Sequence, residues 1–120
     1  MSRLLVHLSS GPENATRAAL AFLVARTAQA NGHEVDLFLA GDAVGLLRDA
    51  TLDAVHGIGT GSLRDHHDAL VSGGARFFAS GMSSKARELT AESLAGRAVE
   101  FAPPDRLVEL AFEADRVLSY

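Results

Sequence analysis

Side chains that could do chemistry gather in one short segment, from Ser80 to Arg87. In order, its candidate residues are Ser80, Gly81, Met82, Ser83, Ser84, Lys85 and Arg87. A serine hydroxyl between a strand and a helix can cap the helix, or act as a nucleophile when a base and an orienting group are within reach. The segment lacks the Gly-x-Ser-x-Gly elbow, which favours capping by Ser83 or Ser84. Lys85, the only lysine of the chain, could hold an anion, and so could Arg87.

A second group of small polar residues, Ser9, Ser10 and Gly11, stands where the first expected strand ends. Glu13 and Asp42 each stand near the start of a following helix. Either carboxylate could act as a general acid or base, but acidic residues are also common there because they suit the helix dipole. The carboxylates define no pair that indicates a hydrolase.

The histidines offer chemistry of lower specificity. His66 and His67 are adjacent and must point to different sides of a helix, which is poor geometry for ligands of one metal. We expect His67 to be packed on an apolar stripe, His66 to point outward or toward a partner, and His7 to be a buried, hydrogen-bonded core residue. His56 remains a secondary site candidate. We predict no metal site and no cofactor.

Strands alternate with helices along the chain, which predicts an α/β fold with a five-stranded, mainly parallel sheet between two helical layers. Expected strands cover residues 3–9, 34–40, 76–79, 98–102 and 116–119. Expected helices cover residues 15–30, 41–48, 62–72 and 85–89, with a helical turn over 91–96, a last helix from Pro103, and an irregular stretch over 49–61.

This architecture gathers the candidate residues at one edge. In open parallel sheets, ligands bind beyond the carboxyl ends of the strands. Ser9–Gly11, Asp42 and Ser80–Arg87 would all lie there, and helix N-termini at such an edge favour anions. The pattern predicts a site for a small anionic ligand.

Composition bounds the class of protein. A chain of 120 residues fits one domain over 1–120. The absence of cysteine excludes a disulfide framework, thiolate metal sites and a cysteine nucleophile. The net charge is 11 − 15 = −4 without a basic block, and no apolar run approaches the roughly 20 residues of a membrane span, so we expect neither nucleic-acid binding nor a membrane partner. The start Met1-Ser2-Arg3-Leu4 has no signal-peptide shape, which favours the cytoplasm.

The first expected helix carries almost no polar face between Ala18 and Ala25. A helix that is apolar all round is usually covered on more than one side. In a domain of this size, we predict that another subunit covers the side of this helix that faces away from the sheet.

Four segments, spread in order over nearly the whole chain, carry a family pattern. They are Leu4-Leu5-Val6-His7-Leu8-Ser9-Ser10-Gly11-Pro12-Glu13, Gly59-Thr60-Gly61-Ser62-Leu63-Arg64-Asp65-His66, Ser80-Gly81-Met82-Ser83-Ser84-Lys85-Ala86-Arg87 and Ala114-Asp115-Arg116-Val117-Leu118. Together they resemble the DsrE/DsrF-like family. The resemblance implies a compact α/β/α domain, homo-oligomers that are often trimers or hexamers, and sulfur transfer through a cysteine persulfide.

The chain departs from the family at the residue that carries sulfur. The family cysteine falls in the loop where this chain has Ser80, with Ser83 or Ser84 as alternative alignments. A serine hydroxyl cannot hold a persulfide. We therefore expect a non-catalytic homo-oligomeric subunit that binds a small anion or a sulfur-relay partner. One alternative is a small hydrolase or transferase that uses Ser80 or Ser84 with a histidine, and another is a structural subunit of a hetero-oligomeric sulfur-transfer complex.

Overall fold

The centre of the molecule is a five-stranded sheet in the order β6-β5-β2-β1-β7, seen in a computed structural model that describes residues 2–120. Every neighbouring pair of strands is parallel. The strands are β1 (Arg3–Leu8), β2 (Glu34–Leu39), β5 (Arg76–Ser80), β6 (Val99–Ala102) and β7 (Arg116–Ser119). The predicted α/β class and parallel sheet are confirmed.

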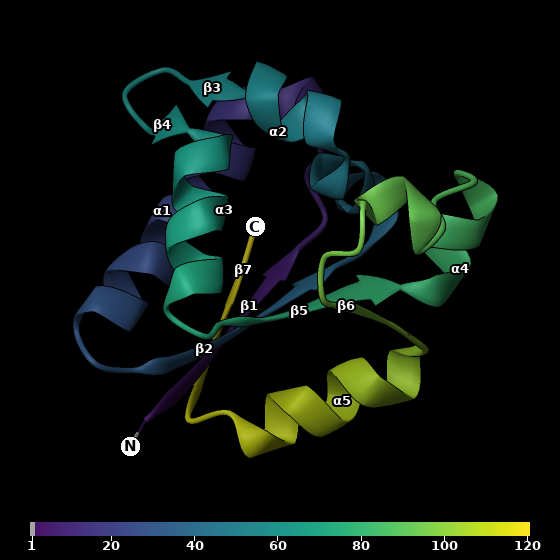
Figure 1. The fold of residues 1–120 in the computed structure, drawn as a ribbon. Coiled ribbons are helices and arrows are strands. Elements are labelled where there is room, and N and C mark those ends of the chain that lie inside the picture. The colour runs from purple at the N-terminus through teal and green to yellow at the C-terminus, as the bar shows by residue number, and fades with distance from the viewer. Residues whose placement is uncertain (1) are drawn as a thin grey trace.

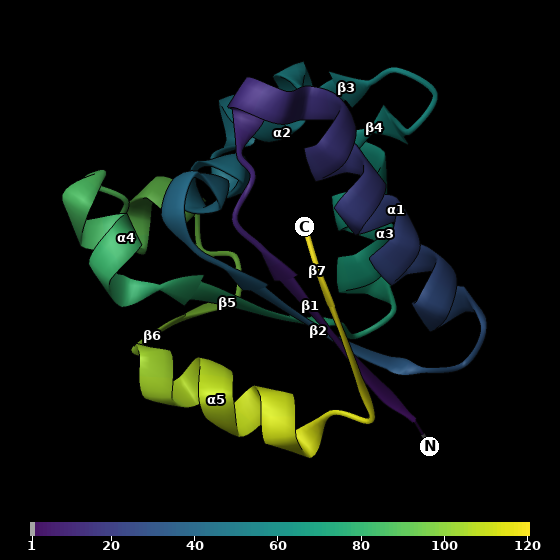
Figure 2. The same cartoon turned by 180° about the vertical axis from the view of Figure 1, so that it is seen from behind.

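Helices cover both faces of the sheet. Figure 1 shows α1 (Ala15–Ala30) and α3 (Leu63–Ser72) on one face and α5 (Pro104–Glu113) on the other. Figure 2 shows the same three layers from behind. Alternate residues of each strand point to opposite faces, so Leu37 enters the large core under α1 and Phe38 enters the smaller core under α5. The predicted three-layer arrangement is therefore confirmed.

Local signals explain where α1 begins and ends. The Asn14 side chain accepts a hydrogen bond from the Arg17 N–H at 3.1 Å, which satisfies a free donor of the first turn. Beyond Ala30, Gly32 adopts a φ of +92°, a conformation that terminates helices and suits glycine. The helix buries Ala18, Ala21 and Phe22 against the sheet, while Leu20 stays 37% exposed on its outer side.

The stretch over residues 49–61 is more regular than its sequence predicts. It contains α2 (Asp49–Ala54) and a small antiparallel pair, β3 (His56–Gly57) with β4 (Gly61–Ser62). Gly59 and Gly61 have positive φ and allow the tight turn between these strands. Thr60 Oγ1 donates to the Thr16 carbonyl of α1 at 3.2 Å, which holds the hairpin against that helix. The expectation of an irregular stretch was wrong: α2 and the β3–β4 pair form between nearby residues, and the contact with Thr16, 44 residues away, holds the hairpin in place.

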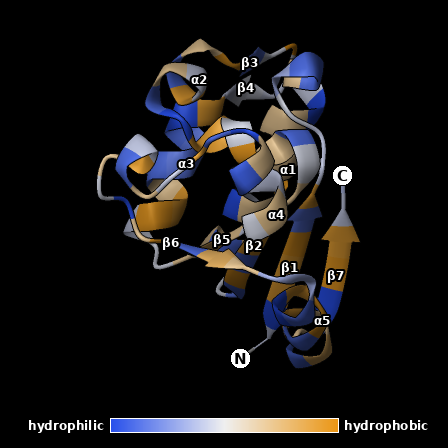
Figure 3. Cartoon of the chain, turned by 90° about the vertical axis from the view of Figure 1, so that its right-hand side faces the viewer, coloured by the Kyte–Doolittle hydropathy of each residue, from blue (hydrophilic) through white to orange (hydrophobic). Residues whose placement is uncertain are grey.

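Short helical turns complete the fold. They are η1 (Pro12–Asn14), η2 (Gly41–Leu47), α4 (Gly81–Ala86) and η3 (Glu92–Leu94). No helix within residues 2–120 is long and apolar enough to cross a membrane. Coloured by hydropathy, β1 and β7 show apolar residues side by side at one margin of the sheet (Figure 3).

Candidate functional site

Loops from separate strands meet at the carboxyl edge of the sheet, as the sequence predicts. The Gly41 N–H, after β2, donates to Ser83 Oγ of α4 at 2.9 Å. Arg87 Nη2 bonds Asp42 Oδ1 at 2.9 Å, and Arg87 Nη1 donates to the Ser83 carbonyl at 3.1 Å. The loops after β2 and β5 therefore form one polar unit, in which Arg87 is already paired with a carboxylate.

The helix in this unit begins earlier than expected. The sequence predicts a helix over 85–89 capped by Ser83 or Ser84, whereas α4 spans Gly81–Ala86. Its cap is Ser80, whose Oγ accepts the Ser83 N–H at 3.2 Å. The backbone then turns at Glu88, where φ is +56° and the helix has ended. Ser80 is thus a capping residue, and the expectation for Ser83 and Ser84 was wrong.

Ser84 has an environment that local sequence does not reveal. Its side chain is buried, and its Oγ has no hydrogen-bond partner among residues 2–120. A buried hydroxyl without a partner costs about 1–3 kcal/mol. Ser84 also lines a hollow of 340 Å³ beside α4, together with Gly81, Lys85 and Phe101.

Lys85 is the cation of this hollow. It is exposed and forms no ion pair with any residue in the described part of the chain. Met82, by contrast, is 72% exposed and does not line the hollow. Glu88, Leu89, Thr90 and Ala91 complete one side of the hollow, so its lining carries one basic and one acidic side chain among mostly apolar and small residues.

The loop after β1 is packed into the same edge. The Gly11 N–H donates to both oxygens of the Glu13 carboxylate, at 2.8 and 3.0 Å. A Cβ on Gly11 would lie 2.4 Å from the Asp42 carbonyl oxygen, so only glycine fits there. Ser9 donates through Oγ to the Tyr120 carbonyl at 3.3 Å, and Ser10 is half-buried beside it. Glu13 therefore occupies a backbone donor that an external anion would otherwise use.

His56 and His66 lie elsewhere. His56 is exposed on β3, in the hairpin beside α1, whereas α4 packs on η2, β5 and β6 (Figures 1 and 2). His66 is 6% exposed and bonds the Thr60 carbonyl through Nε2 at 2.7 Å and Arg26 through Nδ1 at 3.3 Å. The expectation that His66 points outward was wrong because the hairpin folds over its ring. The structure brings neither histidine to Ser80 or Ser84.

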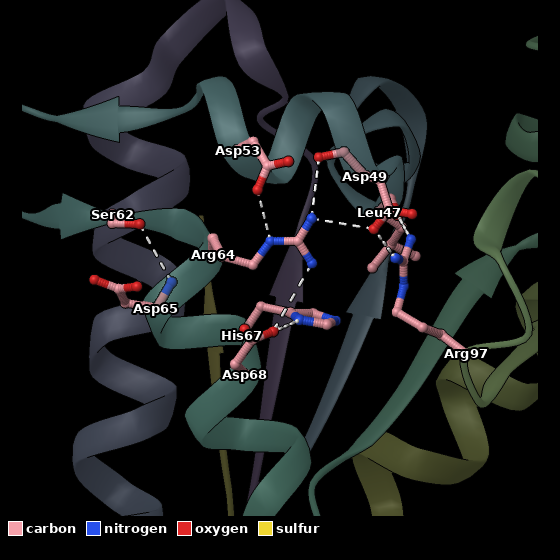
Figure 4. A network of polar contacts seen from close by, with 9 residues as sticks. All are labelled: Leu47, Asp49, Asp53, Ser62, Arg64, Asp65, His67, Asp68 and Arg97. Atoms are coloured by element: carbon pink, nitrogen blue, oxygen red, sulfur yellow. Dashed lines mark hydrogen bonds and ion pairs between the residues drawn. The ribbon is translucent and has the colours of Figure 1, made fainter.

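His67 is packed as predicted. Its ring lies 5.3 Å from the Phe77 ring between centroids, and Nδ1 is 2.9 Å from Asp68 Oδ1. Figure 4 shows this pair beneath Arg64, which also bonds Asp49 and Asp53 and thereby joins α3 to α2. Burial lowers the pKa of His67, and the bond to Asp68 opposes this shift.

His7 differs from its prediction. It is half-buried rather than buried; its ring packs edge-on with Phe38, 6.2 Å between centroids, and has no hydrogen-bond partner among residues 2–120. Burial lowers its pKa. Within residues 2–120, no group of three or more histidine, aspartate or glutamate side chains is placed to hold a metal ion.

These features define a class: a three-layer α/β domain with a five-stranded parallel sheet and a hollow beside α4 at its carboxyl edge, lined in part by Ser84, Lys85 and Glu88. The model of the DsrE/DsrF-like family matches residues 2–120, and the chain belongs to that family. No curated protein matches the chain.

Solved structures share the fold at low sequence identity. The ychN protein from E. coli has a TM-score of 0.83 at 17% identity, with 100% of both chains covered. MTH1491 from Methanobacterium thermoautotrophicum, a protein of unknown function, has a TM-score of 0.76 at 17% identity, again over 100% of both chains. BT1422 from Bacteroides thetaiotaomicron has a TM-score of 0.70 at 14% identity, covering 99% of this chain and 95% of that one. At these identities the likeness concerns the fold alone.

Proposed function

We propose that this protein is a non-catalytic, homo-oligomeric DsrE-like subunit that binds a small sulfur-containing anion at the carboxyl edge of its sheet. The anion is either free or the terminal persulfide of a relay partner, and both present the same negative sulfur group. We place this activity in the cytoplasm. The observation that carries the proposal is the hollow beside α4, whose lining includes Lys85 and Ser84, neither of which has a side-chain partner within residues 2–120.

Lys85 is the anion contact of the proposal: it is the basic residue of the hollow, and it forms no ion pair with Glu88, the acidic residue of the same lining. Arg87 is neutralised by Asp42, and the free N–H of Gly11 is taken by Glu13. Lys85 has no such partner among the described residues, so an anion there would complete its charge balance. Ser84 Oγ, which is buried and has no partner among residues 2–120, would donate a hydrogen bond to an anion that enters far enough to reach it.

Covalent transfer is not part of the proposal. The chain has no cysteine, and the Ser80 hydroxyl caps the N-terminus of α4. A serine alkoxide would need a base within hydrogen-bond reach, and Ser80 Oγ instead accepts a backbone N–H. The chemistry left to this edge is reversible binding.

Exposed apolar residues support the homo-oligomer. Phe112 on α5 is 88% exposed, Leu20 on α1 is 37% exposed, and both apolar residues of β7 are more than 40% exposed. Such residues together favour burial against other subunits. The family resemblance favours trimers or hexamers.

A nuclear magnetic resonance titration tests the binding site, with sodium thiosulfate as the sulfur anion and sodium phosphate as the comparison anion. We expect thiosulfate to shift the amide signals of Gly81, Ser84 and Lys85. Lys85→Gln should weaken binding roughly tenfold, since one charged hydrogen bond contributes about 1.5 kcal/mol. Lys85→Arg, the matched control, should retain most of the affinity. Unchanged affinity in Lys85→Gln would overturn the site.

A further inference from the structure

The two edge strands of the sheet, β6 and β7, differ in how strongly they discourage pairing with a further strand. The edge strand β6 carries Glu100 at its centre and is followed by Pro103 and Pro104, features that discourage further strand pairing. The opposite edge strand, β7, reads Arg116-Val117-Leu118-Ser119 and has no charge or proline at its centre. All of its residues are exposed, including Val117 at 44% and Leu118 at 42%.

The hydrogen bonds to β1 show which backbone groups of this edge are free. Tyr120 donates its N–H to the His7 carbonyl and accepts the Ser9 N–H, both at 2.9 Å. Alternate residues of a strand direct their backbone groups to opposite sides, so Leu118 and Arg116 also face β1. The N–H and C=O groups of Val117 and Ser119 therefore point away from the sheet.

We propose that β7 pairs with β7 of a second copy of this chain, antiparallel and with Leu118 opposite Leu118. The inference rests on the homo-oligomer proposed above and specifies its contact. A two-fold axis perpendicular to the sheet generates this pairing and keeps α1 of both copies on the same face. It joins the two sheets into one.

Backbone geometry selects this register. With Leu118 at the axis, Val117 lies opposite Ser119 of the second copy, so outward N–H and C=O groups on both strands find partners. A register centred on Val117 would instead place Ser119 opposite Asp115. The Asp115 N–H already donates to the Arg3 carbonyl at 2.9 Å, so in that register it could not donate to Ser119 of the second copy.

Side chains on the α1 face fit the same register. Leu118 lies opposite Leu118 of the second copy in a non-hydrogen-bonded pair, in which the two Cα atoms are closer than in a hydrogen-bonded pair. Arg116 lies opposite Tyr120 of the second copy, whose ring suits a guanidinium. In this chain, Arg17 lies 5.9 Å from the Tyr120 ring centroid, so the ring already takes part in one such contact.

The pairing also covers apolar surface beside β7. A hollow of 590 Å³ between α1 and β7 is lined in part by Leu4, Ala28 and Leu118. Figure 2 shows α1 beside the part of the sheet formed by β1 and β7, and Leu20 of this helix is 37% exposed. A second copy on β7 would bring its own α1 to the same side, which accounts for a helix with almost no polar face. A two-fold contact builds dimers and, with another contact, even-numbered rings such as hexamers.

The absence of cysteine makes a direct test available, because Leu118→Cys creates the only thiol of the chain. Opposed Cα atoms of such a pair are about 4.5 Å apart, within the roughly 4.4–6.8 Å of disulfides. On mild oxidation we expect a dimer-mass band on a non-reducing gel, reversed by reductant. Two control variants should stay at monomer mass. In Val117→Cys the new thiol lies opposite Ser119 of the second copy, not opposite its own equivalent. In Ile58→Cys the thiol lies on the distant hairpin, where Ile58 is 89% exposed.

Sedimentation of reduced protein separates this inference from the wider proposal. Val117→Pro removes an outward N–H and spares the bonds to β1, so the assembly should lose this contact while circular dichroism stays unchanged. An oligomer without the Leu118→Cys cross-link, or with an equal Val117→Cys cross-link, would overturn the β7 pairing and leave the homo-oligomer standing. A monomer for the unmodified chain would overturn both.

Discussion

The guanidinium of Arg76 bonds both oxygens of the Asp36 carboxylate, at 2.7 and 2.8 Å, although the Asp36 side chain is only 1% exposed. Arg3 reaches the same carboxylate from the other side, at 3.0 and 3.1 Å. The three residues come from adjacent strands and lie at the amino end of the sheet, opposite the proposed binding edge. These bonds hold β1, β2 and β5 together.

Arg76→Ala should lower the free energy of unfolding by about 2 kcal/mol, because it removes one of two cations from a buried carboxylate. Arg106→Ala is a matched control: both guanidiniums stack on the Phe78 ring, at 5.5 and 5.2 Å, but Arg106 pairs with the more exposed Glu100 and Glu113. That loss should stay below about 1 kcal/mol. Urea denaturation of both variants measures the difference, and equal losses would show that stacking, not the carboxylate, dominates.

Ser84→Ala should change stability and binding in opposite directions. Removal of the unpartnered hydroxyl should leave the free protein as stable or up to about 1 kcal/mol more stable. The same change should weaken thiosulfate binding, since the hydroxyl is proposed to contact the anion. Thermal unfolding and the titration together check this pair of effects. A destabilised variant with full affinity would mean that Ser84 is a packing residue only.

Acidification should destabilise the protein through His67. Burial holds its pKa below 6.5, so the unfolded chain binds a proton first as the pH falls through 6.5. The free energy of unfolding should therefore decrease below that pH, until the folded state also takes up the proton. His67→Phe should reduce this dependence without abolishing it, because His7 shifts in the same direction. A ring titration midpoint at or above 6.5 would contradict the assignment.

Gly11→Ala should destabilise the carboxyl edge. Its Cβ would meet the Asp42 carbonyl oxygen at 2.4 Å, a backbone atom that cannot rotate away. We expect a loss of about 1–3 kcal/mol. Gly45→Ala serves as control, because nothing lies within 4 Å of the Cβ it would gain. If both variants unfold alike, the loops after β1 and β2 are not packed together as described.

The regular part of the fold could be predicted because its signals are local. Apolar runs such as Glu34–Leu39 fit buried strands, and breakers such as Gly32 end helices within a few residues. The gathering of the loops followed from topology, since parallel strands end at the same edge. These rules act without knowledge of distant contacts.

The errors concern contacts that local sequence does not contain. Ser80, Ser83 and Ser84 are all plausible caps, and only the backbone path at Ser80 decides among them. His66 is buried because a hairpin, itself unpredicted, covers its ring. Arg87 and Asp42 are 45 residues apart, so nothing in the sequence showed that their charges cancel.

Native mass spectrometry with added sodium thiosulfate counts subunits and bound anions in one measurement. We expect a homo-oligomer that gains one thiosulfate per subunit. Lys85→Gln should form the same oligomer without the added mass. A monomer, or equal thiosulfate binding by Lys85→Gln, would contradict the proposed function.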